Sequence, residues 1–189
     1  VAHQRQHSKD YYYQVRSSQP KSLYTRAARM IYLNRTCFNG LYRVNLNGMF
    51  NVPIGTKTNV ILKTDDFSKT AKMLRNCNIS CQDFETTVNQ ANEGDFVFIE
   101  PPYTVKHNYN GFIKYNEILF TWSDQVRLKE SVGRAVARGA QVLVLNAAHQ
   151  SIKELYEGYD QQLLSRSNVL AGKASSRGKY EELAIRCGY

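Results

Sequence analysis

The sequence predicts an α/β fold, and three observations carry that prediction. After residue 79, short apolar runs that suit buried strands alternate with amphipathic helical segments. The chain has 189 residues, 42% of them hydrophobic, which is enough for one domain with a substantial core. Ahead of this region, Asn47-Gly48 lies between two alternating runs and predicts a small β-hairpin.

The first part of the chain, residues 1–78, is expected to hold helices and this hairpin. Apolar residues recur at helical spacing from Lys21 to Arg35, which predicts an amphipathic helix. The hairpin spans 41–52, and Pro53 and Gly55 end it. Asp65 or Asp66 can cap a second helix that runs to about residue 75.

The second part, residues 79–189, is expected to hold the sheet. Gly94-Asp95 and the proline pair bound the apolar run at 96–99, which indicates a buried strand. Ser123 can cap a helix over 124–138 that Gly139 ends. A shorter helix is predicted at 150–156. The other strands are expected at 79–84, 141–145, 163–170 and 180–186.

Charge and cysteine content narrow the possible partners. The net charge is +9 and the pI about 9.4, which favours a polyanionic partner such as nucleic acid. No apolar stretch is long enough to span a bilayer and no secretory signal opens the chain, so we expect no membrane association and a cytoplasmic location. The four cysteines form no CxxC pair, so no metal site is expected. Nothing in the sequence indicates an oligomeric state.

Glu100-Pro101-Pro102-Tyr103 is the most informative motif. It follows the predicted strand at 96–99, and ligands of open α/β sheets bind outside the carboxyl ends of the strands. The carboxylate and the Pro101 carbonyl can each accept a hydrogen bond from an amino group, and the Tyr103 ring can stack on a flat heterocycle. The motif therefore suits an exocyclic amine of a nucleobase, although a proline pair and a tyrosine after a strand can also form a simple turn.

Three stretches carry a family resemblance. Tyr32 to Asn45, followed by Gly48 to Gly55, resembles the target-recognition hairpin of the Dam-type (D12 class) DNA adenine-N6 methyltransferases. Glu100-Pro101-Pro102-Tyr103 resembles the DPPY motif of that family, with Glu in place of Asp. The segment from Gly172 to Ile185 is also similar to the family's C-terminal end.

The resemblance implies a partial Rossmann-like methyltransferase sheet and a small hairpin-bearing target-recognition subdomain. The implied enzyme transfers a methyl group from S-adenosylmethionine to adenine N6 in double-stranded DNA at GATC or a related site, in a bacterial or phage-infected cell. The implied catalytic residues are Glu100, Pro101, Pro102 and Tyr103. Asp83, Phe84, Glu100 and Pro101 are expected to contact the cofactor.

The resemblance also implies a set of DNA contacts. Arg43 is expected to read a guanine edge, for which its planar pair of donors is suited. Phe38 matches an aromatic residue that inserts beside the target base, and the other expected DNA contacts are Asn39, Leu41, Pro53, Lys57 and Arg177.

Two departures from the family pattern leave other readings open. The family's glycine-rich cofactor motif, expected upstream of Tyr11, is absent, and the chain begins at Val1 rather than Met. Glu100 is one methylene longer than the family's Asp. The alternative is therefore a catalytically impaired DNA-binding relic or fragment. A third reading, an RNA or protein amino-methyltransferase, keeps the proline pair but not the role of Arg43.

Overall fold

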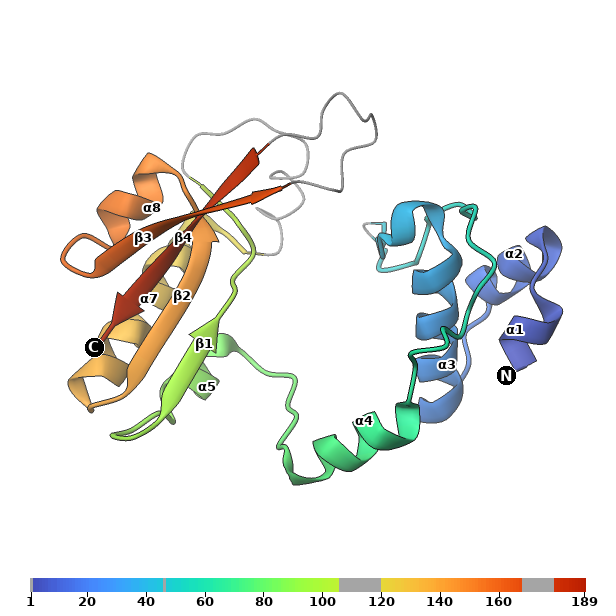
Figure 1. The fold of residues 1–189 in the computed structure, drawn as a ribbon, viewed down its shortest axis with the longest axis horizontal. Coiled ribbons are helices and arrows are strands. Elements are labelled where there is room, and N and C mark those ends of the chain that lie inside the picture. The colour runs from blue at the N-terminus through green and yellow to red at the C-terminus, as the bar shows by residue number, and fades with distance from the viewer. Residues whose placement is uncertain (1, 46, 106–119, 168–178) are drawn as a thin grey trace. The chain divides into compact units, whose positions relative to one another are not determined.

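The computed structural model describes residues 2–45, 47–105, 120–167 and 179–189 (Figure 1). The chain divides into an N-terminal unit, Val1–Asn78, and a C-terminal unit, Ile79–Tyr189. The first unit is helical with irregular connections, and the second contains a four-stranded mixed sheet with helices. The predicted α/β class is confirmed.

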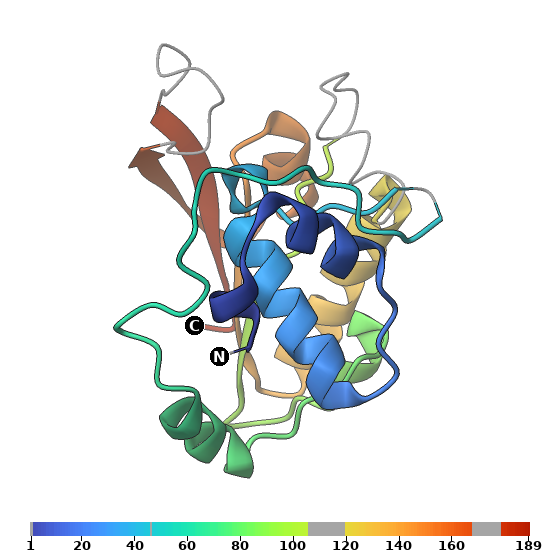
Figure 2. The same ribbon diagram turned by 90° about the vertical axis from the view of Figure 1, so that its right-hand side faces the viewer.

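The N-terminal unit begins with three helices (Figure 2): α1 (Ala2–Gln6), α2 (Lys9–Ser17) and α3 (Leu23–Thr36). The prediction of a helix over 21–35 is confirmed as α3, which starts after Ser22, whose side chain accepts from the Thr25 amide. Helices α1 and α2 were not predicted. Ser8 caps α2 by accepting from the Tyr11 amide, which lets the tyrosine cluster begin a helix.

The core of the N-terminal unit joins these helices to the segment that follows them. The Tyr12 hydroxyl donates to the Val52 carbonyl at 3.0 Å, which fastens α2 to residues far along the chain. Burying a tyrosine requires such a partner for its hydroxyl. The buried members of this core are Tyr12, Val15, Tyr32, Leu33, Cys37, Phe50, Val52 and Val60.

The predicted hairpin is only partly regular. The Asn45 amide donates to the Met49 carbonyl at 2.9 Å, and the Gly48 amide donates to the Asn45 carbonyl at 2.9 Å, so the chain does reverse at Asn47-Gly48. Between the described residues of 41–52, however, the only ladder contact is one antiparallel bridge, Val44 to Phe50. The expected strands on either side of the turn are therefore wrong, because the segment is anchored by its side chains rather than by a ladder.

Beyond the hairpin, Asp66 caps α4 (Phe67–Met73). Of the two caps predicted for this helix, Asp65 and Asp66, the second is the one observed. A short 3-10 helix, Leu74–Asn76, extends α4. The strand predicted at 79–84 is wrong. Those residues form no strand, and Asp83 is instead the N-cap of α5 (Phe84–Val88), where its carboxylate accepts from the Glu85 amide at 2.9 Å.

The sheet of the C-terminal unit has the order β1-β2-β4-β3. Its strands are β1 (Phe96–Ile99), β2 (Gln141–Ala147), β3 (Asp160–Ser167) and β4 (Lys179–Cys187). β1 pairs with β2 in parallel, and β4 pairs antiparallel with both β2 and β3. Strands were predicted at each of these places; β2, β3 and β4 differ from the expected bounds by a few residues, and 168–170 lie outside the described residues.

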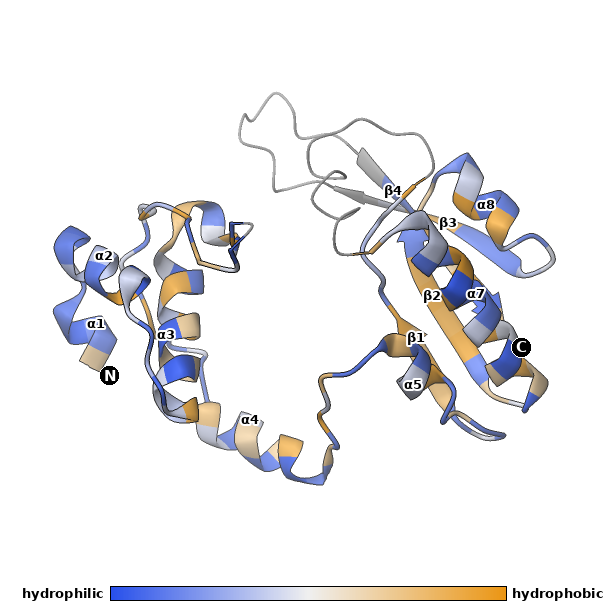
Figure 3. Cartoon of the chain, turned by 180° about the vertical axis from the view of Figure 1, so that it is seen from behind, coloured by the Kyte–Doolittle hydropathy of each residue, from blue (hydrophilic) through white to orange (hydrophobic). Residues whose placement is uncertain are grey.

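Helices α7 (Trp122–Ala137) and α8 (Gln150–Leu155) bury one face of this sheet. Figure 3 shows α7 running across the hydrophobic strand β2. Val142, Val144 and Ile185 are fully buried in the shared core. Both helices match predicted ones, but Thr121 rather than Ser123 caps α7, through a capping box with Asp124. Gly139, with φ 92°, ends α7 as predicted.

Candidate functional site

Residues 100–103 leave the sheet at the carboxyl end of β1. Pro101 is buried and Glu100 is exposed, with no hydrogen bond or ion pair to any described residue. Tyr103 is partly buried, and its hydroxyl donates to Glu182 Oε1 of β4 at 3.1 Å. The motif thus has a solvent-facing carboxylate at its start and an anchored aromatic ring at its end.

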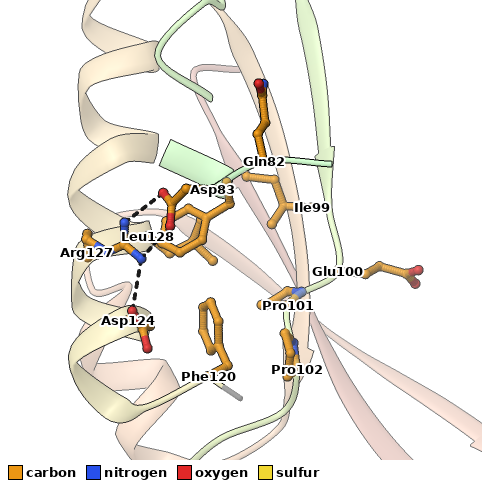
Figure 4. A pocket seen from close by; sticks show the side chains of 11 residues that line it. Gln82, Asp83, Ile99, Glu100, Pro101, Pro102, Phe120, Asp124, Arg127 and Leu128 are labelled. Atoms are coloured by element: carbon orange, nitrogen blue, oxygen red, sulfur yellow. Dashed lines mark hydrogen bonds and ion pairs between the residues drawn. The ribbon is translucent and has the colours of Figure 1, made fainter. Parts of the chain in front are cut away.

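A cavity of about 360 Å³ lies beside this turn (Figure 4). It brings together both segments for which cofactor contacts were predicted, Asp83-Phe84 and Glu100-Pro101. Pro102 also lines it, whereas Tyr103 does not. In Figure 4 the Glu100 carboxylate points away from the cluster around Arg127. The remaining lining residues are Gln82, Ile99, Phe120, Asp124, Arg127 and Leu128.

Aromatic and aliphatic side chains form the walls of the cavity. The Phe84 and Phe120 rings have centroids 5.6 Å apart and planes inclined at 55°. Ile99 and Leu128 add aliphatic surface. Carboxylates of Asp83 and Asp124 also line the cavity, so it can take a flat, largely apolar group that has a polar edge.

Arg127 organises the polar side of the cavity. Its Nη1 donates to Asp83 Oδ1 at 2.8 Å and its Nη2 to Asp83 Oδ2 at 3.0 Å, a bidentate pair. The same guanidinium reaches Glu85 at 3.2 Å and Asp124 at 3.0 Å, and it lies 4.2 Å from the centroid of the Phe84 ring. Arg127 therefore holds the start of α5 against α7.

The charges in this cluster shift one another's proton affinities. The hydrogen bonds from Arg127, and then from the Glu85 amide, lower the pKa of Asp83. Bonds from the amide and hydroxyl of Thr121 lower the pKa of Asp124, with Arg127 adding to the effect. The acceptors, Asp83 first, raise the pKa of Arg127. All three groups are thus held in their charged forms near neutral pH.

Acid is expected to remove the contribution of this cluster to stability. A carboxyl whose pKa is lower in the folded chain stabilises the fold above its unfolded pKa, and the stabilisation is lost as the pH falls through the folded pKa, below about 4. Asp83→Asn keeps an N-cap side chain but loses the charge. Urea unfolding should show wild type more stable than this variant at about pH 7, with the gap closing toward about pH 3; an unchanged gap would contradict the assignment.

Sequence reasoning missed Arg127, Asp124 and Phe120 as site residues. A signal did exist for two of them. Thr121 followed three residues later by Asp124 is a capping-box pattern, and Asp124 and Arg127 have the i, i+3 spacing that places them on one helix face. Nothing in the local sequence indicates that α5 supplies the other carboxylates.

The predicted DNA contacts that the structure describes belong to the N-terminal unit. Phe38 is 56% exposed at the end of α3, and Asn39 follows it with φ 56°, a left-handed conformation that asparagine tolerates. The Phe38 amide donates to the Pro53 carbonyl at 2.9 Å, so the two predicted contacts Phe38 and Pro53 are neighbours. Leu41 is partly buried.

Gly55 fixes the geometry of this loop. A β-bridge joins Cys37 to Ile54, and the Gly55 amide donates to the Thr36 carbonyl at 2.7 Å. A Cβ atom at Gly55 would lie 2.5 Å from the Cys37 carbonyl oxygen, closer than real Cβ contacts come. Only glycine allows the chain to return this closely past the end of α3.

Arg43 and Lys57 are exposed in the same unit. Arg43 Nε donates to Asn51 Oδ1 at 3.1 Å across the reversed chain, which holds its side chain along the loop. Arg177 lies outside the described residues.

Within the described part of the chain, no group of three or more His, Cys, Asp or Glu side chains is placed to hold a metal ion. None of the described helices is both long and apolar enough to cross a bilayer.

Comparison with known proteins identifies the family. The sequence pattern that defines the D12 class N6 adenine-specific DNA methyltransferases matches residues 1–171. The chain belongs to this class. The resemblance noted in the sequence is thereby confirmed. The predicted enzyme type, an adenine-specific DNA methyltransferase, is confirmed with it.

Individual relatives agree with the assignment. A type II methyltransferase of Lactococcus lactis subsp. cremoris is 35% identical over 97% of this chain and 68% of its own length. A type II methyltransferase of Methanocaldococcus jannaschii is 34% identical over 94% of this chain and 64% of its own length. The DNA adenine methylase of Escherichia coli K12 is 29% identical over 91% of this chain. The chain thus spans about two thirds of the length of these curated relatives.

Proposed function

We propose that this D12-class chain transfers a methyl group from S-adenosylmethionine to adenine N6 in double-stranded DNA, at GATC or a related site. The observation that carries the proposal is the Glu100-Pro101-Pro102-Tyr103 turn at the end of β1, beside a cavity that Asp83 and Phe84 also line. Residues 79–189 would then be a catalytic region with a partial Rossmann-like sheet. Residues 1–78 would be the target-recognition region.

The cavity suits the nucleoside part of the proposed cofactor. Phe84 and Phe120 offer flat apolar surface for an adenine ring, and Asp83 offers acceptors at its edge. Glu100 and Pro101 line this cavity from the turn, and the Glu100 side chain points away from the cluster around Arg127 (Figure 4). When bound, S-adenosylmethionine supplies an electrophilic methyl group on a sulfonium centre. We propose that Asp83, Phe84, Glu100 and Pro101 hold it.

The proposed chemistry of the turn is orientation of the target amine. The N6 lone pair of adenine is delocalised into the ring, so the nitrogen is a poor nucleophile. If Glu100 and the Pro101 carbonyl accept its two N–H groups, the nitrogen becomes more tetrahedral and its lone pair is directed toward the methyl donor. The exposed Glu100 carboxylate, which has no described partner, is free to take this role.

The target base must leave the helix before it can reach the turn. Everting a base costs a few kcal/mol, and stacking on an aromatic ring returns about 1–3 kcal/mol. Tyr103 is proposed as that ring, since Glu182 anchors its hydroxyl and limits its rotation. In the recognition region, we propose that Arg43 reads guanine and that Phe38 inserts beside the target. Asn39, Leu41, Pro53, Lys57 and Arg177 are the other proposed DNA contacts.

The proposal is tested by methyl transfer to defined duplexes. The full chain is incubated with labelled S-adenosylmethionine and a duplex that contains one GATC site, or the same bases in scrambled order, at stated salt. We expect N6-methyladenine, identified by mass spectrometry of the nucleosides, from the GATC duplex only. Duplex binding without methyl transfer, and without calorimetric heat from the cofactor, would instead identify a DNA-binding relic. Equal methylation of RNA or protein would contradict the DNA assignment.

A further inference from the structure

Gln125 and Asn146 are two polar side chains that lie fully buried behind the Glu100–Tyr103 turn. Gln125 belongs to α7 and Asn146 to β2, and both have 0% exposed surface. A buried amide is costly unless its donors and acceptors are satisfied. Their presence in a largely apolar core therefore requires hydrogen-bond partners for both amides.

The two amides hydrogen-bond in a chain that leads to the turn. Asn146 Nδ2 donates to Gln125 Oε1 at 3.1 Å. Gln125 Nε2 in turn donates to the Pro102 carbonyl at 3.3 Å and to the Thr104 carbonyl at 3.2 Å. Gln125 thus bridges the carbonyls on either side of Tyr103.

Asn146 determines which end of the Gln125 amide faces the turn. Its Oδ1 accepts from the Ala147 backbone amide at 2.9 Å, so its NH₂ group must be the end that faces Gln125. Gln125 consequently presents its oxygen to Asn146 and both of its N–H donors to the turn. A carbonyl oxygen facing Pro102 and Thr104 would meet two other acceptors and be repelled.

The turn needs such an external donor because of its prolines. Pro101 and Pro102 have no backbone N–H, and the proline ring fixes φ but leaves ψ free. The turn contributes its own bond from the Thr104 amide to the Pro102 carbonyl at 2.9 Å, and Thr104 Oγ1 donates to the Phe120 carbonyl at 2.6 Å. The bridge from Gln125 adds a constraint on the Pro102–Tyr103 and Thr104–Val105 peptide groups.

We propose that Gln125 is a positioning residue, oriented by Asn146, that fixes the Pro101–Thr104 turn and with it the direction of the Pro101 carbonyl and the Tyr103 ring. This inference rests on the proposed methyl transfer for its effect on turnover. Neither side chain would touch the cofactor or the base. Their contribution would be the geometry of the groups that do, where about 1 Å of displacement can cost about 100-fold in rate.

Two variants test this in different ways. Gln125→Met keeps the length and volume of the side chain but removes both donors. Asn146→Asp keeps the volume of Asn146 but presents an oxygen to Gln125, so the Gln125 amide should rotate and point its own oxygen at the turn. In the full chain we expect each to lower kcat by about 10- to 100-fold with KM for DNA little changed. Each variant also leaves a buried polar group without its partner, so its unfolding midpoint should fall, but the chain should stay folded under assay conditions.

Amide hydrogen exchange gives a readout that does not depend on activity. Both variants should speed exchange of the Thr104 amide, while the amides of β2 and α7 keep their protection. Ser131→Ala is the matched control, because Ser131 is also fully buried in α7. Among the described residues its hydroxyl bonds only within the helix, donating to the Arg127 carbonyl and accepting from Arg134. This control should keep wild-type kcat and wild-type Thr104 exchange.

The outcomes separate this inference from the proposed function. If wild type transfers no methyl group, the proposed function fails, but Thr104 exchange still decides whether Gln125 holds the turn. Wild-type exchange and turnover in both variants would overturn the inference. If exchange rises across the whole C-terminal unit, or if both variants fail to fold, then Gln125 and Asn146 stabilise the unit as a whole rather than the turn in particular. That result would also overturn the positioning role.

Discussion

Glu100→Gln is expected to lower the turnover of methyl transfer by about 100- to 1,000-fold, the usual effect of removing one preorganised group that stabilises developing charge. Glutamine has the size of glutamate but offers one acceptor oxygen instead of two and carries no charge. Because Glu100 is exposed and bonds to no described residue, the change should leave the free energy of unfolding within about 0.5 kcal/mol of wild type. Single-turnover kinetics and urea unfolding measure the two effects.

Two further substitutions complete this experiment. Glu100→Asp keeps the carboxylate that the family pattern has at this position, so it should retain more turnover than Glu100→Gln. Glu130→Gln makes the same chemical change at another exposed glutamate of the C-terminal unit, in α7, and should behave as wild type. Full turnover in Glu100→Gln would show that the carboxylate plays no part in the reaction.

Gly55→Ala is expected to have the largest effect on the N-terminal unit. The added Cβ would meet the Cys37 carbonyl oxygen at 2.5 Å and the Cys37 carbonyl carbon at 2.8 Å, and both are backbone atoms that cannot rotate away. Forced contacts of this kind cost about 1–3 kcal/mol. The same shift would separate Phe38 from Pro53, so affinity for a GATC duplex should fall together with stability.

Gly133→Ala is the matched control for this change. Gly133 lies within α7, where an added Cβ would meet only the Tyr159 hydroxyl oxygen at the ordinary distance of 3.7 Å. Alanine favours a helix over glycine by about 1 kcal/mol, so this variant should unfold at higher urea concentration than wild type. Equal stability of the two alanine variants would contradict the steric role of Gly55.

Much of the fold could be predicted from local pattern. Some elements could be predicted from their own residues alone: β1 from its apolar run, and α3 and α7 from their helical periodicity. The end of α7 could be predicted from the glycine that follows it. The error at 79–84 has a local cause. The segment has apolar residues at its two ends, which suggested a strand. Its last residues instead begin helix α5, because the Asp83 carboxylate caps that helix.

Helix α2 was missed because its buried residues, Tyr12 and Val15, pack against distant partners. The short helix α1 buries no residue, and its His3 ring stacks on the distant Tyr32. Tyr12 and Tyr32 fill one core, and His7 Nδ1 lies 2.9 Å from the Tyr32 hydroxyl oxygen across 25 residues of sequence. A run of three tyrosines does not by itself indicate a helix, since aromatic residues favour strands. Tertiary packing overrides that preference here.

The residues of the candidate site also fall into two groups, those that local sequence could identify and those that depend on tertiary packing. Glu100 to Tyr103 could be recognised because four adjacent residues carry the chemistry, and Asp83-Phe84 followed from the family resemblance. Gln125 could not, since it acts through the Pro102 and Thr104 carbonyls, which lie more than 20 residues away in the sequence. For Arg127 the only local signal was its i, i+3 spacing to Asp124, because its contact with Asp83 spans 44 residues. Their importance depends on how α7 packs beside α5 and β2, which no short motif encodes.

The mixed sheet has a consequence for synthesis of the chain. β2 is parallel to β1 but antiparallel to β4, so the end of β2 lies beside the beginning of β4, with Ala147 opposite Glu182. The turn after β1 is synthesised before the partner of the Tyr103 hydroxyl, which is made almost 80 residues later. A nascent chain that stops before Glu182 therefore carries the whole motif but lacks the carboxylate that anchors its ring.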